Sequence, residues 1–304
     1  MYSFSSCWNS YRHTDGRAML REIRDLGFEY AELSHGIRIS LLPGILEAVE
    51  AGEIKISSLH NFCPLPIGVN QPAPNLFQFS SIDPRERESA YKHTLRTIET
   101  AARVKAPIVV MHMGSIEMRD YTDRLLDMVE KGENNSPKYD KLCSELMEKR
   151  EERKEKFVEN TAAMLERLIE PAEKAGVKLA IENREALEEI PFESDLSLFF
   201  KRFPSPNVVY WHDCGHAQIK ENLGFVHHRL LLESMSKRLA GFHVHDVKFP
   251  RRDHCVPGAG TIDYVALKPL VKPEHIKVFE LSPSGKLDEV QAGIAHLKSI
   301  WGEE

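Results

Sequence analysis

Short apolar runs and longer amphipathic stretches alternate along this chain. The apolar runs are rich in Val and Ile, whereas apolar residues in the longer stretches recur every three or four positions. Buried strands and amphipathic helices produce these two patterns. Six of the apolar runs also stop at a His, Asp or Glu: IKISSLH at His60, APIVVMH at His112, VKLAIE at Glu182, NVVYWHD at Asp213, LAGFHVHD at His245 and Asp246, and IKVFE at Glu280.

The alternation of strand and helix repeats eight times within the 304 residues. A (β/α)8 barrel of parallel strands usually needs about 250 residues. The sequence therefore predicts an α/β fold, a single (β/α)8 TIM barrel that spans residues 1–304. A doubly wound open sheet is the alternative, but it would normally carry a glycine-rich phosphate loop after its first strand. The segment SSCWNSYRHTDG at that position has no such loop.

Two segments depart from the regular alternation. Residues 115–156 contain GENNSPKYDKL and the mixed-charge run ELMEKREERKEKF, so we expect a charged helical insertion after the fourth strand. Its long helix should be solvated and should continue to Gly176, and a lid or a contact in a homo-oligomer is the alternative role. The Pro- and Asn-rich loop from Phe62 to Phe79 is long enough to fold over the barrel mouth, which is a hypothesis from its length and placement.

Composition limits the partners and the compartment. The 46 acidic residues slightly outnumber the 40 basic ones, and no basic patch is obvious, so nucleic acid is not an expected partner. The five cysteines include no CxxC pair, as expected for free thiols in a reducing compartment. We see no secretory signal pattern and no apolar run of the ~20 residues that cross a bilayer. A cytoplasmic protein that does not enter the membrane is expected.

The polar residues at the strand ends are the candidate chemistry. A barrel brings the carboxyl ends of all its strands to one rim, so these side chains should converge on one pocket. A single His at a strand end is more often structural, but buried carboxylates such as Glu182, Asp213 and Glu280 are costly unless they are paired or bind a metal. Oxygen and imidazole ligands together suit Mn²⁺, Co²⁺, Mg²⁺ or Zn²⁺. The sequence therefore predicts a divalent-metal site.

Local spacing refines the candidate ligands. Asp213 and His216 lie three positions apart, so a turn after the strand can aim both into the pocket. The two-residue period of a strand puts His243 and His245 on the same side, and we favour His245 as the ligand because it is nearer the rim. Further candidates are Arg251 and Arg252, which could clamp a phosphate or a sugar hydroxyl or could be surface charges. Residues near the first strands could line a sugar pocket: Trp8, which could stack on a ring or be a core aromatic, Asn9, Tyr11, Glu32 and His35.

These motifs together resemble the xylose isomerase-like barrel superfamily, which includes sugar isomerases, ketose 3-epimerases, inosose dehydratases and endonuclease IV. The resemblance covers most of the second half of the chain and extends into the first half. As a set the motifs are specific for the superfamily and weak for the substrate. They are VMHMGS at His112, AIEN at Glu182, HDCGHA at Asp213 and His216, FHVHD at His245, VPGAG after His254, and VFEL at Glu280.

The resemblance implies a metal-dependent isomerase or epimerase whose substrate is a small sugar or polyol. The implied metal ligands are Glu182, Asp213, His245 and Glu280. The two glutamates are also the implied acid–base pair, which moves a proton through a metal-stabilised cis-enediolate. His216 and an arginine from the Arg251–Arg252 loop would hold substrate oxygens.

Three alternatives stay open within the same resemblance. An inosose dehydratase-like lyase would use the same residues, and a non-catalytic sugar-binding barrel would not need two glutamates. An endonuclease IV-like phosphodiesterase with three zinc ions would draw His60, His112, His216 and His254 into a second metal site or the pocket. Arg252 stands where that enzyme has an aspartate, and an arginine cannot ligate zinc.

Overall fold

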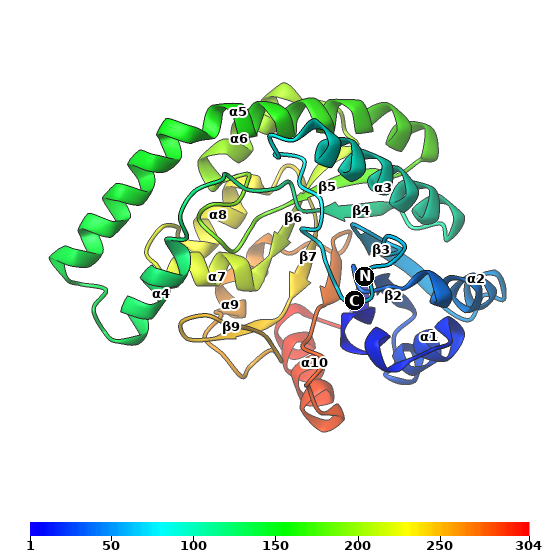
Figure 1. The fold of residues 1–304 in the computed structure, drawn as a ribbon. Coiled ribbons are helices and arrows are strands. Elements are labelled where there is room, and N and C mark those ends of the chain that lie inside the picture. Colours follow the sequence, from blue (N-terminus) through cyan, green and yellow to red (C-terminus); the bar gives the residue numbers. More distant parts are fainter. Residues whose placement is uncertain (304) are drawn as a thin grey trace.

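The computed structural model describes residues 1–303 of the chain. Eight parallel strands close into a barrel in the order β1-β10-β7-β6-β5-β4-β3-β2, and helices surround it (Figure 1). The predicted (β/α)8 barrel is thus confirmed. The barrel strands are β1 Tyr2–Ser5, β2 Tyr30–Leu33, β3 Lys55–His60, β4 Ile108–Met111, β5 Lys178–Glu182, β6 Val208–Asp213, β7 Leu239–Val244 and β10 Ile276–Phe279.

The helices follow the strands in the expected alternation, with two differences in detail. They are α1 Gly16–Asp25, α2 Leu42–Glu50, α3 Pro84–Arg103, α4 Thr122–Glu130, α5 Pro137–Ala175, α6 Glu193–Arg202, α7 Cys214–Asn222, α8 His228–Met235, α9 Tyr264–Leu267 and α10 Leu287–Trp301. Helix α7 starts directly after β6, where we expected only a turn, because the Asp213 carboxylate accepts the His216 backbone N–H and caps the helix. The segment TIDYVALKPL forms only a short α helix and a 3₁₀ turn.

Side chains of each barrel strand alternate between the interior and the layer of helices, as β6 illustrates. Val209 and Trp211 pack in the small interior cluster with residues of β4, β5 and β10. Tyr210 belongs to the larger core between the barrel and its helices. The next residues continue this alternation, so Asp213 lies on the interior side and His212 on the helix side.

The insertion after β4 consists of α4 and the 39-residue helix α5, which packs along α3 on the outside of the barrel (Figure 1). Ser136 caps the start of α5, and Gly176 ends it with a positive φ of 69°, a conformation that glycine adopts without strain. The Glu188 carboxylate, from the loop after β5, accepts the backbone N–H groups of Tyr121 and Thr122 at the start of α4. The insertion is therefore joined to the carboxyl end of the barrel.

A two-stranded hairpin projects from the carboxyl end of the barrel after β7. Its strands, β8 Asp246–Lys248 and β9 Arg252–Cys255, are antiparallel. The Asp246 carboxylate accepts backbone N–H groups of Gly258, Gly260 and Ile262, and so fixes the loop that follows the hairpin. Within residues 1–303, no helix combines the length and the apolar character that crossing a membrane requires.

Candidate active site

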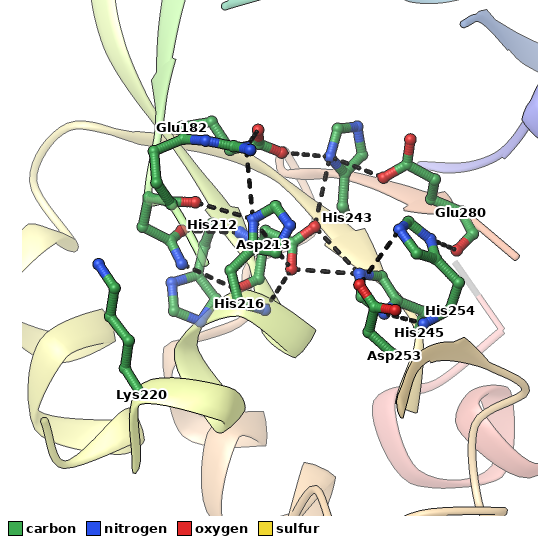
Figure 2. Close-up of polar contacts among 12 residues, drawn as sticks. Glu182, His212, Asp213, His216, Lys220, His243, His245, Asp253, His254 and Glu280 are labelled. Atoms are coloured by element: carbon green, nitrogen blue, oxygen red, sulfur yellow. Dashed lines mark hydrogen bonds and ion pairs between the residues drawn. The ribbon is translucent and has the colours of Figure 1, made fainter. Parts of the chain in front are cut away.

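Four barrel strands deliver a buried cluster of carboxylates and one imidazole to the carboxyl end of the barrel. Glu182 ends β5, Asp213 ends β6, His243 lies near the end of β7, and Glu280 follows β10 (Figure 2). Glu32 on β2 lies next to them, and all five residues are at most 4% exposed. Burying so many carboxylates together is unfavourable unless positive charge compensates them.

The imidazole of His243 lies at the centre of this cluster. Its Nδ1 is 2.6 Å from a Glu182 oxygen, 3.2 Å from a Glu280 oxygen and 3.7 Å from an Asp213 oxygen. Its Nε2 is 3.1 Å from Glu32 Oε2, and the other oxygen of Glu32 is buried without a hydrogen-bond partner. Nε2 can donate a proton to Glu32, while Nδ1 faces three carboxylates whose negative charge favours a proton or a metal ion on that nitrogen.

The charges of this cluster shift its pKa values in opposite directions. Burial by itself lowers the pKa of His243, but Glu280, Glu32 and Glu182 outweigh burial and raise it well above the ordinary value. Burial raises the pKa of Glu280 to about 8, with repulsion from Glu32 and Glu182 adding to it. Burial opposes the charge on Glu182 too, but the Arg184 guanidinium and His243 keep its pKa well below the ordinary value.

His245, which we favoured as the metal ligand, holds Asp213 in place. Its Nε2 lies 3.0 and 3.1 Å from the two Asp213 oxygens, and its Nδ1 accepts the backbone N–H of His254 at 2.9 Å. Because Nδ1 accepts, Nε2 carries the proton and donates to Asp213. The ring fits only because residue 215 is glycine: a Cβ there would lie 2.1 Å from His245 Cε1.

Asp213 is also held by its own backbone neighbours. Its Oδ1 accepts the His216 N–H at 2.7 Å, and the Asn183 amide bonds both the N–H and the C=O of Asp213. His216 itself lies close to the site, with Nδ1 at 3.0 Å from the Asn183 carbonyl oxygen and 3.6 Å from Asp213. Within residues 1–303, these contacts are made by Nδ1 of His216 and none is made by its Nε2.

The second oxygen of Glu182 faces the imidazoles from β3 and β4. His112 Nε2 lies 3.0 Å from Glu182 Oε2 and His60 Nε2 lies 3.9 Å from it. Asn75, from the long loop after β3, contacts His112 Nδ1 at 2.8 Å. The structure thus brings the predicted residues His60 and His112 to the same carboxylate as the central cluster.

A buried arginine that we did not single out from the sequence completes the surroundings of Glu182. Arg184 donates through Nη1 to Glu182 Oε2 and through Nε to Glu189 at 3.1 Å. Arg184 is only 5% exposed, and the buried Glu182 together with the partly buried Glu189 balances its charge. Asn183 ends the AIEN motif and Arg184 directly follows it, and this closeness to Glu182 was the sequence feature that could have indicated both residues.

A cavity of about 430 Å³ opens beside Glu280, and His35, Arg252 and His254 are among the residues that line it. His254 is anchored there because its Nδ1 lies 3.0 Å from the Glu280 carbonyl oxygen and its ring stacks on His245 at 4.2 Å. A cavity of this size is in the range of small-molecule sites.

Two of the predicted substrate-binding residues lie elsewhere. Arg251 forms ion pairs with Asp123, Asp127 and Glu130 of α4, so its guanidinium points toward the insertion. Trp8 is 4% exposed and packs in the core, where its Nε1 donates to the Gly285 carbonyl oxygen. These positions match the alternatives that we left open, a surface charge for Arg251 and a core aromatic for Trp8, because opposite charge on α4 attracts Arg251 and apolar burial holds Trp8.

A family model described as "Xylose isomerase-like TIM barrel" matches residues 20–300. The chain belongs to this family. The resemblance inferred from the strand-end motifs is thereby confirmed. No curated protein matches this chain.

Solved structures with a similar fold cover almost the whole chain. A D-tagatose 3-epimerase-like protein has a TM-score of 0.71 at 17% identity, with 98% of this chain and 96% of that chain covered. The 3-keto-D-glucoside 4-epimerase of E. coli has a TM-score of 0.70 at 14% identity, with 98% of each chain covered. A putative xylose isomerase of Rhodospirillum rubrum has a TM-score of 0.71 at 15% identity, with 99% and 97% covered. At these identities the likeness is one of fold.

Proposed function

We propose that this protein is a divalent-metal-dependent isomerase or epimerase whose substrate is a sugar or polyol. The observation that carries the proposal is the convergence of Glu182, Asp213 and Glu280 on one nitrogen of His243, within 3.7 Å. Three carboxylates and one imidazole form a donor set that suits Mn²⁺, Co²⁺, Mg²⁺ or Zn²⁺. Sugar epimerases among the structures of similar fold support the same assignment.

The proposed metal ligands are Glu182, Asp213, His243 and Glu280. This set replaces His245 of our sequence-based hypothesis with His243, because His245 Nε2 donates its proton to Asp213. Glu32 would orient the ligand imidazole through its Nε2, the outer-shell arrangement that histidine ligands usually have. The bound ion would polarise a substrate carbonyl and its neighbouring hydroxyl, which makes the intervening C–H more acidic.

Glu182 and Glu280 are the proposed acid–base pair. They come from β5 and β10, which two strands separate in the barrel, and both reach His243. One carboxylate removes the proton beside the carbonyl to give an enediolate, and the other returns a proton to the opposite face or to the neighbouring carbon. Arg184 holds one oxygen of Glu182 and so fixes the direction in which the carboxylate points.

The cavity beside Glu280 is the proposed substrate pocket. His35 and His254 on its wall offer ring nitrogens to substrate hydroxyls, and Arg252 offers a guanidinium at the mouth. His35 Nδ1 is a buried atom without a hydrogen-bond partner, so it has capacity for a substrate oxygen.

Solvent-proton exchange tests this function directly. The protein, loaded in turn with Mn²⁺, Co²⁺, Mg²⁺ and Zn²⁺, is incubated with a panel of ketoses, their phosphates and keto-inositols in D₂O. Incorporation of deuterium beside the carbonyl, with formation of an isomer of unchanged carbon skeleton, is expected. An absence of exchange in every substrate and metal combination would contradict the proposal.

The same assay separates the rival activities. Loss of water after exchange would identify a dehydratase, which starts from the same proton abstraction. The phosphodiesterase is a second candidate because His60 and His112 approach Glu182, which could then bridge two ions. Two or three zinc ions per chain, together with cleavage of a DNA strand at an abasic site, would favour that activity over the isomerase.

A further inference from the structure

A second group of metal-ligating side chains lies on the other face of β6 from Asp213. His212, Cys214 and His228 bring two imidazole nitrogens and a thiol within 4.8 Å of one another. Their exposed fractions are 0%, 0% and 4%. His212 lies on β6, whereas Cys214 and His228 are the first residues of α7 and α8. Figure 2 shows His212 beside the candidate active site. This group is not used in the proposed mechanism.

Hydrogen bonds of Asn183 and Tyr210 determine which ring nitrogen of His212 carries the proton. The orientation of the Asn183 amide is unambiguous, because Oδ1 accepts the Asp213 N–H at 2.8 Å and Nδ2 donates to the Asp213 carbonyl at 2.9 Å. Tyr210 therefore donates its hydroxyl proton to Asn183 Oδ1 at 3.0 Å. The Tyr210 oxygen can then only accept from His212 Nδ1, which lies 2.9 Å away.

Hydrogen bonds at the other end fix the proton on His228 in the same way. Gln218 Nε2 donates to Glu221 at 3.2 Å and to Asn222 Oδ1 at 3.0 Å, and Asn222 is itself oriented by donating to the Pro250 carbonyl oxygen. The Gln218 carbonyl oxygen is thereby left facing His228 Nδ1 at 3.3 Å. This contact is a hydrogen bond only if His228 Nδ1 carries a proton.

The two neutral imidazoles therefore face each other with unshared electron pairs. With both Nδ1 atoms protonated, each Nε2 of a neutral ring has a lone pair, and the two Nε2 atoms lie 2.9 Å apart. Two lone pairs at this distance repel in a site from which water is excluded. A positive charge shared between His212 and His228 would remove the conflict, and the Cys214 thiol lies beside the pair.

We propose that His212 Nε2, His228 Nε2 and Cys214 Sγ bind one thiophilic metal ion, Zn²⁺ or Cu⁺. Thiolate and imidazole ligands favour these ions over the hard ions that suit the carboxylate cluster. Each imidazole already has an outer partner on Nδ1, Tyr210 for one and Gln218 for the other, as histidine ligands of metals usually do.

Cys214 is the first residue of α7, and its buried thiol lies beside the two imidazoles. Binding of the metal ion would displace the thiol proton, as it does wherever a cysteine ligates a metal. Metal–nitrogen bonds of about 2.0–2.1 Å would require the two rings to separate slightly from their hydrogen-bonding distance. The ion would tie β6 to α7 and α8 behind Asp213, so its expected role is structural.

Cobalt substitution tests this site separately from the carboxylate cluster. The full chain is produced in medium in which Co²⁺ replaces zinc, and its near-ultraviolet absorption is recorded for the wild type, Cys214→Ser and Cys63→Ser. A thiolate-to-cobalt charge-transfer band can come only from a sulfur ligand, and the carboxylate cluster contains none. Cys63 is a fully buried thiol outside the group and serves as the matched control.

We expect the charge-transfer band in the wild type and Cys63→Ser and its loss in Cys214→Ser. Elemental analysis of wild-type protein from unsupplemented medium should show bound zinc or copper, and the element found identifies the ion. Cys214→Ser and His228→Gln should lose this metal, whereas Glu280→Gln should keep it. A wild type without the band, whose zinc and copper content does not change in Cys214→Ser, would overturn the proposal. His212 and His228 would then share a proton instead.

Discussion

The imidazole of His243 links Glu32 on one side to three carboxylates on the other. Its Nε2 lies 3.1 Å from Glu32, whereas its Nδ1 faces Glu182, Glu280 and Asp213. In the proposed metal site, Glu32 would accept the proton of His243 Nε2 and leave Nδ1 for the metal ion. The carboxylate that orients the ligand comes from β2, far in sequence from the strands that supply the ligands.

The first prediction concerns this orienting contact. Glu32→Gln keeps the shape of the side chain but removes its charge, so metal affinity should fall by roughly 10- to 100-fold, the usual effect of losing an outer-shell partner. Calorimetric titration of the metal-free protein with Mn²⁺ measures the affinity of the wild type and of the variant. Glu22→Gln, a change within α1 that is outside the carboxylate cluster, is the control. Equal affinity in wild type and Glu32→Gln would contradict the role of Glu32.

The second prediction concerns the acid–base pair. Glu182→Gln and Glu280→Gln should each reduce proton exchange by at least about 10²-fold, because the amide cannot accept the substrate proton. Exchange in D₂O at saturating metal measures the loss, and circular dichroism checks that the fold is intact. Full activity in either variant would remove that glutamate from the pair.

Neighbouring arginines of the hairpin provide a third prediction. Arg251 pairs with α4, whereas Arg252 lines the cavity beside Glu280. Arg252→Gln should raise KM for an anionic or polyhydroxylated substrate roughly tenfold, since it removes a charge-assisted hydrogen bond. Arg251→Gln should leave KM unchanged and is the matched control. If Arg251→Gln raised KM more than Arg252→Gln did, the hairpin would have to be oriented differently when substrate is bound.

A fourth prediction concerns stability. Lys220 is 0% exposed and its Nζ lies 2.8 Å from Glu193 Oε1. Glu193→Gln would leave the lysine charge buried without its partner, which should lower the free energy of unfolding by roughly 3 kcal/mol. Urea denaturation measures the change. Replacing both residues, as Lys220→Met with Glu193→Leu, should recover most of the lost free energy of unfolding. If Glu193→Gln alone were as stable as the wild type, the prediction would be wrong.

Much of the candidate site could be predicted from the residues at which the apolar runs of the sequence end. Parallel strands in a closed barrel bring their carboxyl ends together, so residues such as Glu182, Asp213 and Glu280 had to meet once the alternation was recognised. The choice between His243 and His245 did not follow, because both lie on the same side of β7. Our proposal of His243 rests on strand register: Asp213 lies opposite His243 on the neighbouring strand, which sets His243 level with the carboxylates.

The sequence by itself determined the strand and helix alternation, the barrel and the polar residues at its rim, because these depend on periodicity and chain order. Tertiary structure decided the partners of each side chain. In the folded chain, Arg251 forms ion pairs with α4, Trp8 is buried in the core, and Arg184 donates a hydrogen bond to Glu182. These contacts depend on the relative positions of elements far apart in sequence, which local patterns do not encode.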